Sequence, residues 1–254
     1  MFKKYRSIAI NNLIIILLSL PILSYGNQIY DNSLNESVFD RINIYFNKTA
    51  TNRYDRFLSE VDKNTKIFVH FHGCSGIGYN DYDIKNEYLK HDAAVFFIDF
   101  LSRRGVSIGC PGGLSHVGGM YGKATHSGDI SRIDIRRKEA EVLVKDLLAK
   151  GYKNIYISGH SEGGRTATTW TLPVKGVIVH GMDCGVPGFW NIQRNQKTIV
   201  LLSKNDMWLS AQRTMMGCRN FFNKDWVTEI VTDDASHAAF NTDTHINEFR
   251  KWLN

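Results

Sequence analysis

The sequence has no CxxC pair, no nucleic-acid-binding motif, no internal repeat and no low-complexity linker. The first absence argues against a zinc site, and the second against a nucleic-acid partner. A net charge of +6 is modest and identifies no partner. Arg103-Arg104 and Arg136-Arg137-Lys138 are short basic clusters, and we expect the second to form a solvated helix face. Hydrophobic residues make up 43% of the chain, as in ordinary globular proteins.

The N-terminus has the three-part pattern of a secretory signal peptide. Basic residues precede an apolar run over 13–23, and the small residues Ser24 and Gly26 occupy the −3 and −1 positions of a cut after Gly26. The apolar run is shorter than the ~20 residues that a membrane span needs. We therefore expect residues 1–26 to direct export, to the periplasm or beyond. An uncleaved anchor is the alternative, and it would be the protein's only contact with a membrane.

The four cysteines all lie in the expected mature chain, residues 27–254. An even number in an oxidising compartment predicts two disulfides, although four cysteines allow three pairings. The length of this part suits a single α/β domain.

From residue 67 onward, short apolar runs alternate with helix-compatible segments. Continuous apolar strands of this kind predict a doubly wound, mostly parallel sheet with helices on both faces. Residues 27–66 are polar and irregular in comparison, with one candidate strand and one weak helix. The expected strands are 41–46, 67–73, 93–100, 154–161, 174–183, 197–206 and 227–233, and the clearest helices are 52–61, 133–151 and 245–253.

Gly159-His160-Ser161-Glu162-Gly163 stands where a strand ends and a helix begins. The G-x-S-x-G pattern in that context is typical of a nucleophile elbow, a sharp bend that exposes the serine oxygen. Side chains at the two flanking glycine positions would collide. A buried strand followed by a glycine-rich turn is the structural alternative.

An elbow serine needs an acid and then a histidine, in that chain order. Asp206 is the preferred acid, because it follows an apolar run and so lies at the carboxyl end of a strand, where such sheets place reactive groups. A helix-capping role is the alternative for this residue. Asp183 is the second choice, while Asp233 and Asp234 lie too close to His237 in sequence.

His237 is the preferred base, because it falls in a loop between the last strand and the last helix. His180 lies within a strand and is expected to be a core histidine. His245 begins the terminal helix, where we expect a solvated side chain.

The oxyanion hole requires two backbone N–H donors. The residue after the nucleophile, Glu162, supplies one, and Cys74, in the loop after an early strand, is the candidate for the other. His70 and His72 share a strand face, but no third metal ligand accompanies them, so we expect both to be structural.

Four segments together resemble the α/β-hydrolase fold and, within it, the exported branch of the dienelactone hydrolase family. The resemblance covers about residues 65–254. Enzymes at the centre of that family use a cysteine nucleophile, whereas this chain has Ser161, which favours a serine esterase over the family's lactone chemistry. The four segments are 70–76, 99–110, 159–164, and 204–208 taken with 236–240.

The resemblance also implies the disulfides Cys74–Cys110 and Cys184–Cys218, both bracing loops around the site. A long glycine-rich connection follows Arg103 and Arg104. These two arginines are candidates for binding a substrate carboxylate, with solvated loop side chains as the alternative.

These observations predict a serine hydrolase that cleaves small-molecule carboxylic esters through an acyl-enzyme, with no metal or organic cofactor. A serine peptidase of the prolyl-oligopeptidase type is the nearest alternative. Against it, we find no large N-terminal domain that would restrict access to the site. A non-catalytic binding module is the other alternative. The ordered set of Ser161, Asp206 and His237 argues against it.

Overall fold

The computed structural model describes residues 37–100, 126–182, 196–206, 225–237 and 240–254. The expected signal peptide and the candidate substrate contacts Arg103 and Arg104 lie outside these ranges. None of the helices within them is long and apolar enough to cross a membrane.

The described strands form one eight-stranded sheet with the order β2-β1-β4-β3-β5-β6-β7-β8. β1 pairs antiparallel with β2 and β4, and every other neighbouring pair is parallel. The mostly parallel sheet predicted from the sequence is therefore confirmed. The strands are β1 (Ile42–Phe46), β2 (Thr49–Thr51), β3 (Lys66–Phe71), β4 (Ala93–Ile98), β5 (Ile155–His160), β6 (Gly176–His180), β7 (Thr198–Ser203) and β8 (Val227–Thr232).

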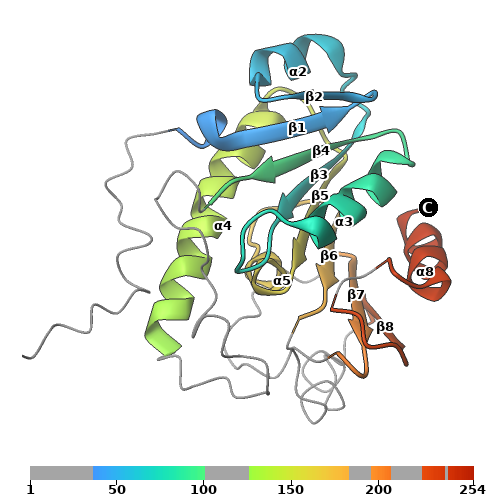
Figure 1. Cartoon of the computed structure of the whole chain (residues 1–254). Helices are drawn as coiled ribbons and strands as arrows, with labels where there is room; N and C mark the ends of the chain where they lie inside the picture. The colour runs from blue at the N-terminus through green and yellow to red at the C-terminus, as the bar shows by residue number, and fades with distance from the viewer. Residues whose placement is uncertain (1–36, 101–125, 183–195, 207–224, 238–239) are drawn as a thin grey trace, which may run out of the picture.

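Helices cover both faces of the sheet (Figure 1). One hydrophobic core lies under α2, α4 and α5, and a second lies under α3 and α8 on the opposite face. β4 is buried along its whole length, as expected of a strand covered on both sides. The helices are α2 (Tyr54–Glu60), α3 (Tyr79–Leu89), α4 (His126–Ala149), α5 (Glu162–Thr168) and α8 (Asp243–Leu253), and a short 3₁₀ helix, η1, spans Val38–Arg41.

The parallel strands end before the polar residues that the sequence pattern had included in them. β3 ends at Phe71 rather than at residue 73, and β7 ends at Ser203 rather than at residue 206. The residues just beyond each strand form loops at the carboxyl edge of the sheet, and these loops carry the candidate site.

Within residues 27–66, the structure confirms the candidate strand 41–46 as β1 and the weak helix 52–61 as α2, and it adds the short strand β2, which was not predicted. β1 alternates buried and half-buried residues, and a turn at Asn47 and Lys48, both with positive φ, joins it to β2. Phe57 of α2 is fully buried and meets the ring of Phe96 edge-on, with centroids 4.7 Å apart. β2 was not predicted, because it has only three residues and because the turn before it lacks the glycine that usually marks a hairpin.

Removing side-chain volume from β1 tests whether this N-terminal part belongs to the core. We expect Ile44→Ala to lower the free energy of unfolding by about 2–5 kcal/mol, since Ile44 is fully buried. Val142→Ala is the control, because Val142 of α4 is 52% exposed and should cost less than about 0.5 kcal/mol. Urea unfolding measures both, and equal small losses would place β1 outside the core.

Candidate active site

Ser161 occupies a sharp bend between β5 and α5. Its backbone has φ 55° and ψ −117°, a conformation that is rare and strained for a residue with a side chain. Its N–H donates to the carbonyl of His180 at 2.9 Å, which fastens the bend to the end of β6. The side chain is only partly buried. The structure thus has the sharp bend that the sequence pattern predicts.

The glycines on either side of the serine are required by close backbone contacts. A Cβ at Gly159 would overlap the carbonyl of Gly163, and a Cβ at Gly163 would overlap the carbonyl of Phe71. The start of α5 therefore lies directly against the end of β3. No side chain fits between them.

Asp206 and His237 form a hydrogen-bonded pair. Asp206 follows the end of β7, and its Oδ2 lies 2.7 Å from Nδ1 of His237, which comes from the loop between β8 and α8. The Asp206 side chain is fully buried, whereas 14% of the His237 side chain is exposed. A buried carboxylate paired to one nitrogen of an imidazole holds the ring in one orientation and one tautomer.

The other acidic candidates differ in their positions. Asp183, the second choice, lies outside the described residues. Asp234 accepts hydrogen bonds from the Ser203 hydroxyl and the Ser236 N–H, both at 2.8 Å, and so braces the loop that carries His237.

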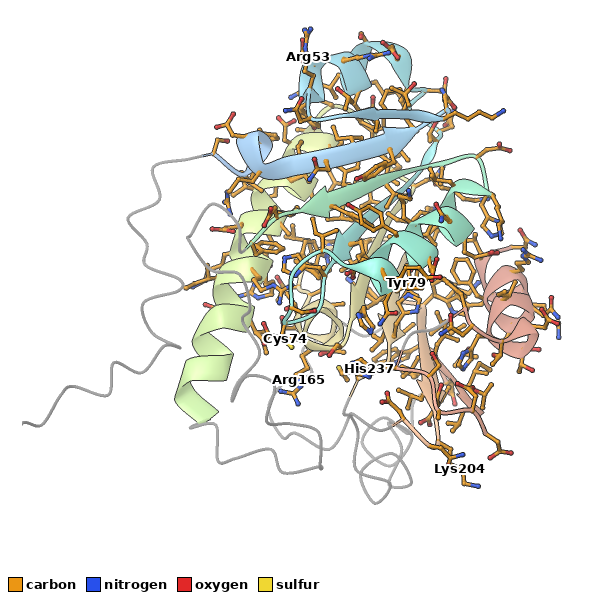
Figure 2. The ribbon with its side chains drawn as sticks, in the orientation of Figure 1. Arg53, Cys74, Tyr79, Arg165, Lys204 and His237 are labelled. Atoms are coloured by element: carbon orange, nitrogen blue, oxygen red, sulfur yellow. The ribbon has the colours of Figure 1, made fainter. Side chains whose placement is uncertain are left out.

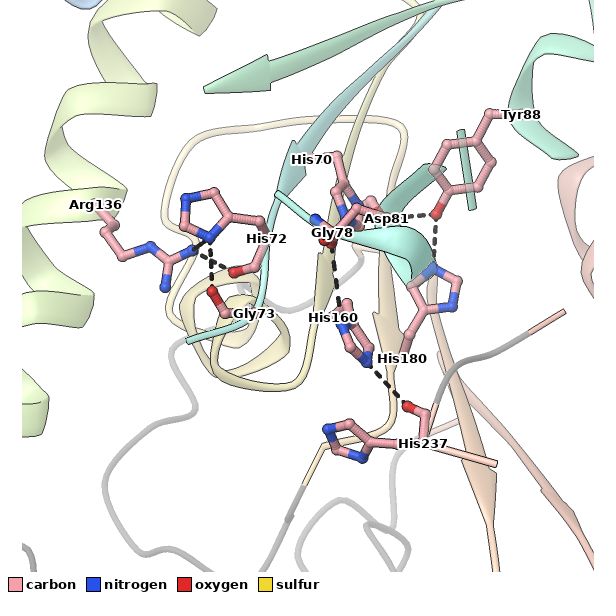
Figure 3. Close-up of polar contacts among 11 residues, drawn as sticks. His70, His72, Gly73, Gly78, Asp81, Tyr88, Arg136, His160, His180 and His237 are labelled. Carbon is pink, nitrogen blue, oxygen red and sulfur yellow. Dashed lines mark hydrogen bonds and ion pairs between the residues drawn. The ribbon is translucent and has the colours of Figure 1, made fainter. Parts of the chain in front are cut away.

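His160, the residue before the serine, holds the loop of His237. Its Nε2–H donates to the backbone carbonyl of His237 at 3.0 Å, and the centroids of the two imidazole rings lie 4.9 Å apart (Figure 3). A Cβ at Gly181 would overlap the same carbonyl, so the loop packs tightly onto the end of β6. Burial, together with the charge that His237 would carry, lowers the pKa of His160 to about 3. His160 therefore stays neutral beside His237.

A buried acid–histidine pair lies beneath His160. Asp81 accepts hydrogen bonds from Nε2 of His70 at 2.9 Å and from the Gly78 N–H at 2.8 Å, and its Oδ1 is 3.9 Å from Nδ1 of His160 (Figure 3). Burial alone would raise the pKa of Asp81, but the hydrogen bond from His70 contributes to holding it below its ordinary value. The carboxylate is therefore charged and anchors α3 under the site.

Further hydrogen bonds continue from His70 across β5 to β6, by way of Tyr88 of α3. The Ser158 hydroxyl lies 2.9 Å from Nδ1 of His70 and 2.6 Å from the Tyr88 hydroxyl, which is 2.7 Å from Nε2 of His180. A single direction of donation, from His180 toward His70, satisfies every one of these contacts. Ser158 is fully buried, so these residues are structural rather than a second catalytic set.

The expectation of a solvated His245 is wrong. His245 is 1% exposed, and its Nε2 lies 3.1 Å from the carbonyl of Leu202, near the end of β7. This contact holds the first turn of α8 against the sheet, and Thr242 caps the helix by accepting the His245 N–H. His70, His72 and His180 are core histidines, as predicted.

The loop after β3 lies beside the serine. A Cβ at Gly73 would be 3.5 Å from Cβ of Ser161, and Figure 2 shows Cys74 and His237 at the edge where the parallel strands end. Cys74 forms a disulfide. Its expected partner Cys110 lies outside the described residues, as do Cys184 and Cys218, so both pairings remain predictions. The donor roles of the Cys74 and Glu162 N–H groups also remain predictions.

Arg136 corrects the expectation of a solvated basic cluster on α4. Its side chain is fully buried, whereas that of Lys138 is 65% exposed. Nη1 donates to Oε1 of Glu162 at 2.8 Å, and Nη2 donates to the carbonyl of His72. The spacing of the buried positions on α4 carried the signal, since Arg136 falls one turn before the buried Ala140.

Within the described ranges, no group of three or more His, Cys, Asp or Glu side chains has an arrangement that could hold a metal ion. The described candidate site consists of a serine on a strained bend and a histidine–carboxylate pair.

Comparison with solved structures identifies the architecture. The chain is similar to a phospholipase/carboxylesterase from Dyadobacter fermentans (TM-score 0.59, 12% identity, covering 84% of this chain and 96% of the other). It is also similar to an esterase from Pyrococcus furiosus (0.53, 16%, 76% and 82%) and to an α/β serine hydrolase without a lid from Xanthomonas campestris (0.51, 14%, 76% and 81%). No family model and no curated protein matches the sequence. The chain has the α/β-hydrolase fold, as predicted.

Adding a methyl group between α5 and β3 tests the close contact behind the serine. We expect Gly163→Ala to cost more than about 3 kcal/mol of unfolding free energy, because its Cβ meets backbone that cannot move aside. In Gly151→Ala, the new Cβ enters open space and meets only the strain of a left-handed φ, about 1–2 kcal/mol. Equal costs in urea unfolding would contradict the packing described above.

Buried neutral histidines make the fold sensitive to acid. The pKa of His72 is lowered to about 3 by burial and by Arg136, and burial lowers the pKa of His180 well below its ordinary value. The unfolded chain binds protons at these histidines below about pH 6.5 and the folded chain does not, so stability falls as the pH drops, by about 1.4 kcal/mol per pH unit for each histidine.

His180→Gln isolates one of these contributions. We expect its unfolding free energy to fall less steeply than that of the wild type between about pH 6 and pH 4. The difference in slope should be about 1.4 kcal/mol per pH unit, the contribution of one histidine. Urea unfolding at about pH 8, where histidine is neutral in both states, gives the cost of the substitution itself. An unchanged slope would mean that His180 is not held neutral in the folded protein.

Proposed function

We propose that the protein is a serine hydrolase that cleaves carboxylic esters through an acyl-enzyme intermediate. The observation that carries this proposal is the strained, only partly buried bend at Ser161 together with the hydrogen-bonded pair of His237 and Asp206. All three lie just beyond the carboxyl ends of strands, where sheets of this kind place reactive groups.

In the proposed reaction, His237 accepts the proton of the Ser161 hydroxyl as the serine oxygen attacks the ester carbonyl. Asp206 keeps the Nδ1–H of His237 directed toward itself and stabilises the imidazolium cation. The N–H groups of Cys74 and Glu162 bind the oxyanion of the tetrahedral intermediate. His237 then protonates the leaving alcohol, and water releases the acyl group by the same steps. The proposal involves no metal or organic cofactor.

His160 stands closer to Ser161 in sequence, but it is unsuited to act as the base. Its Nε2–H is bound to the His237 carbonyl, and burial keeps its pKa at about 3. A base with so low a pKa holds no useful proton affinity near neutral pH. The two neighbouring imidazoles thus have separate roles, one in proton transfer and one in fixing a loop.

A small-molecule ester is the proposed substrate, in line with the esterases among the structures of similar fold. A serine nucleophile favours an esterase of dienelactone hydrolase type over a lactone hydrolase. Export through the segment 1–26 is part of the proposal and is carried by the sequence pattern alone.

Hydrolysis of p-nitrophenyl esters of graded acyl length tests the proposed reaction. We expect Ser161→Ala to abolish turnover and Asp206→Asn to lower kcat by about 10⁴-fold, because the neutral amide no longer holds the correct tautomer of His237. Circular dichroism should show that both variants keep the fold.

A fluorophosphonate probe distinguishes the alternatives. Labelling at Ser161 without hydrolysis of any ester would replace the ester proposal with a peptidase, to be tested on peptides. Absence of both labelling and turnover would favour a binding module.

A further inference from the structure

Arg136 connects the two backbone segments that carry the proposed oxyanion donors. One side of its guanidinium binds the Glu162 carboxylate, which belongs to the residue after the nucleophile. The other side binds the carbonyl of His72, at the start of the loop that leads to Cys74 (Figure 3). The planar fork of an arginine suits such a double attachment, which a lysine ammonium cannot reproduce with the same geometry.

The surroundings of Arg136 fix the orientation of its guanidinium. The group lies 4.9 Å from the centre of the Phe100 ring, at the end of β4, and the side chain is fully buried. A buried ion pair is a weak source of stability, because desolvation offsets most of the attraction. Its contribution here is better sought in the geometry that it imposes on the two segments.

The hydrogen bonds around His72 determine which way the loop N–H groups point. Nδ1–H of His72 donates to the Gly73 carbonyl at 2.6 Å, and its Nε2 accepts the Phe100 N–H at 3.3 Å. A trans peptide is planar, so its N–H points opposite to its C=O. With the Gly73 carbonyl turned toward the His72 ring, the Cys74 N–H points away from that ring. Arg136 fixes the preceding peptide in the same manner.

We propose that Arg136 is a positioning residue that holds the Gly73–Cys74 peptide and the Glu162 backbone so that their N–H groups converge on the oxyanion. This inference rests on the proposed function. It assigns Arg136 no contact with the substrate; its effect passes through His72 and Glu162. Losing the bridge should therefore weaken binding of the transition state more than binding of the substrate.

The double variant Arg136→Met/Glu162→Gln removes the bridge without leaving a buried charge unpaired. We expect kcat for a p-nitrophenyl ester to fall by about 10²-fold while KM changes by less than about 3-fold. The affinity for an alkylboronic acid, which forms a tetrahedral adduct on the serine, should fall in parallel with kcat.

A matched control removes an ion pair on the opposite face of the sheet. Arg250 of α8 binds Glu87 of α3 at 2.8 Å, and the Glu87 side chain is 3% exposed. Arg250→Met/Glu87→Gln should lower the unfolding free energy but leave kcat and boronate affinity unchanged. A loss of kcat in this control equal to that in the bridge variant would reduce the role of Arg136 to general stability, and would overturn the proposal.

Arg136→Lys keeps the positive charge but not the fork, and it remains informative if the double variant fails to fold. We expect a loss of kcat close to that of the double variant. Full activity with lysine, or a double variant that keeps kcat within about 3-fold, would overturn the positioning role while leaving the serine mechanism intact. An inactive, unlabelled wild type would instead overturn the proposed function.

Discussion

The contact between Gly163 and the carbonyl of Phe71 is the constraint on which the site depends. It brings the first turn of α5 against the end of β3, and the neighbouring contact between Gly159 and the carbonyl of Gly163 closes the bend in which Ser161 has its strained conformation. The same contact places the loop after β3 beside the serine. Because this contact is made by backbone, the distance between nucleophile and loop is set by the sheet itself rather than by adjustable side chains.

The histidines around the serine differ in their burial and in their hydrogen-bond partners. His72, His160 and His180 are buried, with pKa values far below that of free histidine, and they serve as fixed hydrogen-bonding groups. His237, by contrast, is partly exposed and is hydrogen-bonded to the buried carboxylate of Asp206. Burial and pairing thus assign different chemistry to the same side chain within one region.

Apolar runs and chain order were sufficient to predict the sheet and the pairing of Asp206 with His237, because both follow from where parallel strands end. β1 was predicted as the strand 41–46, but β2 was missed, since it has only three residues and the turn before it has no glycine. Arg136 was misassigned because three adjacent basic residues suggest a solvent-exposed helix face, although helical spacing places the first of them toward the core. The location of its partners, His72 and Glu162, depends on long-range packing that no local pattern contains.

Within the part of the chain that the structure describes, the hairpin of β1 and β2 also ends one side of the sheet. β2 has only three residues, so it offers few free backbone groups along that edge. Short edge strands are one means by which proteins avoid adding strands from neighbouring molecules. Apart from its contribution to the core, the N-terminal hairpin therefore leaves little backbone along that border with which a strand of another molecule could pair.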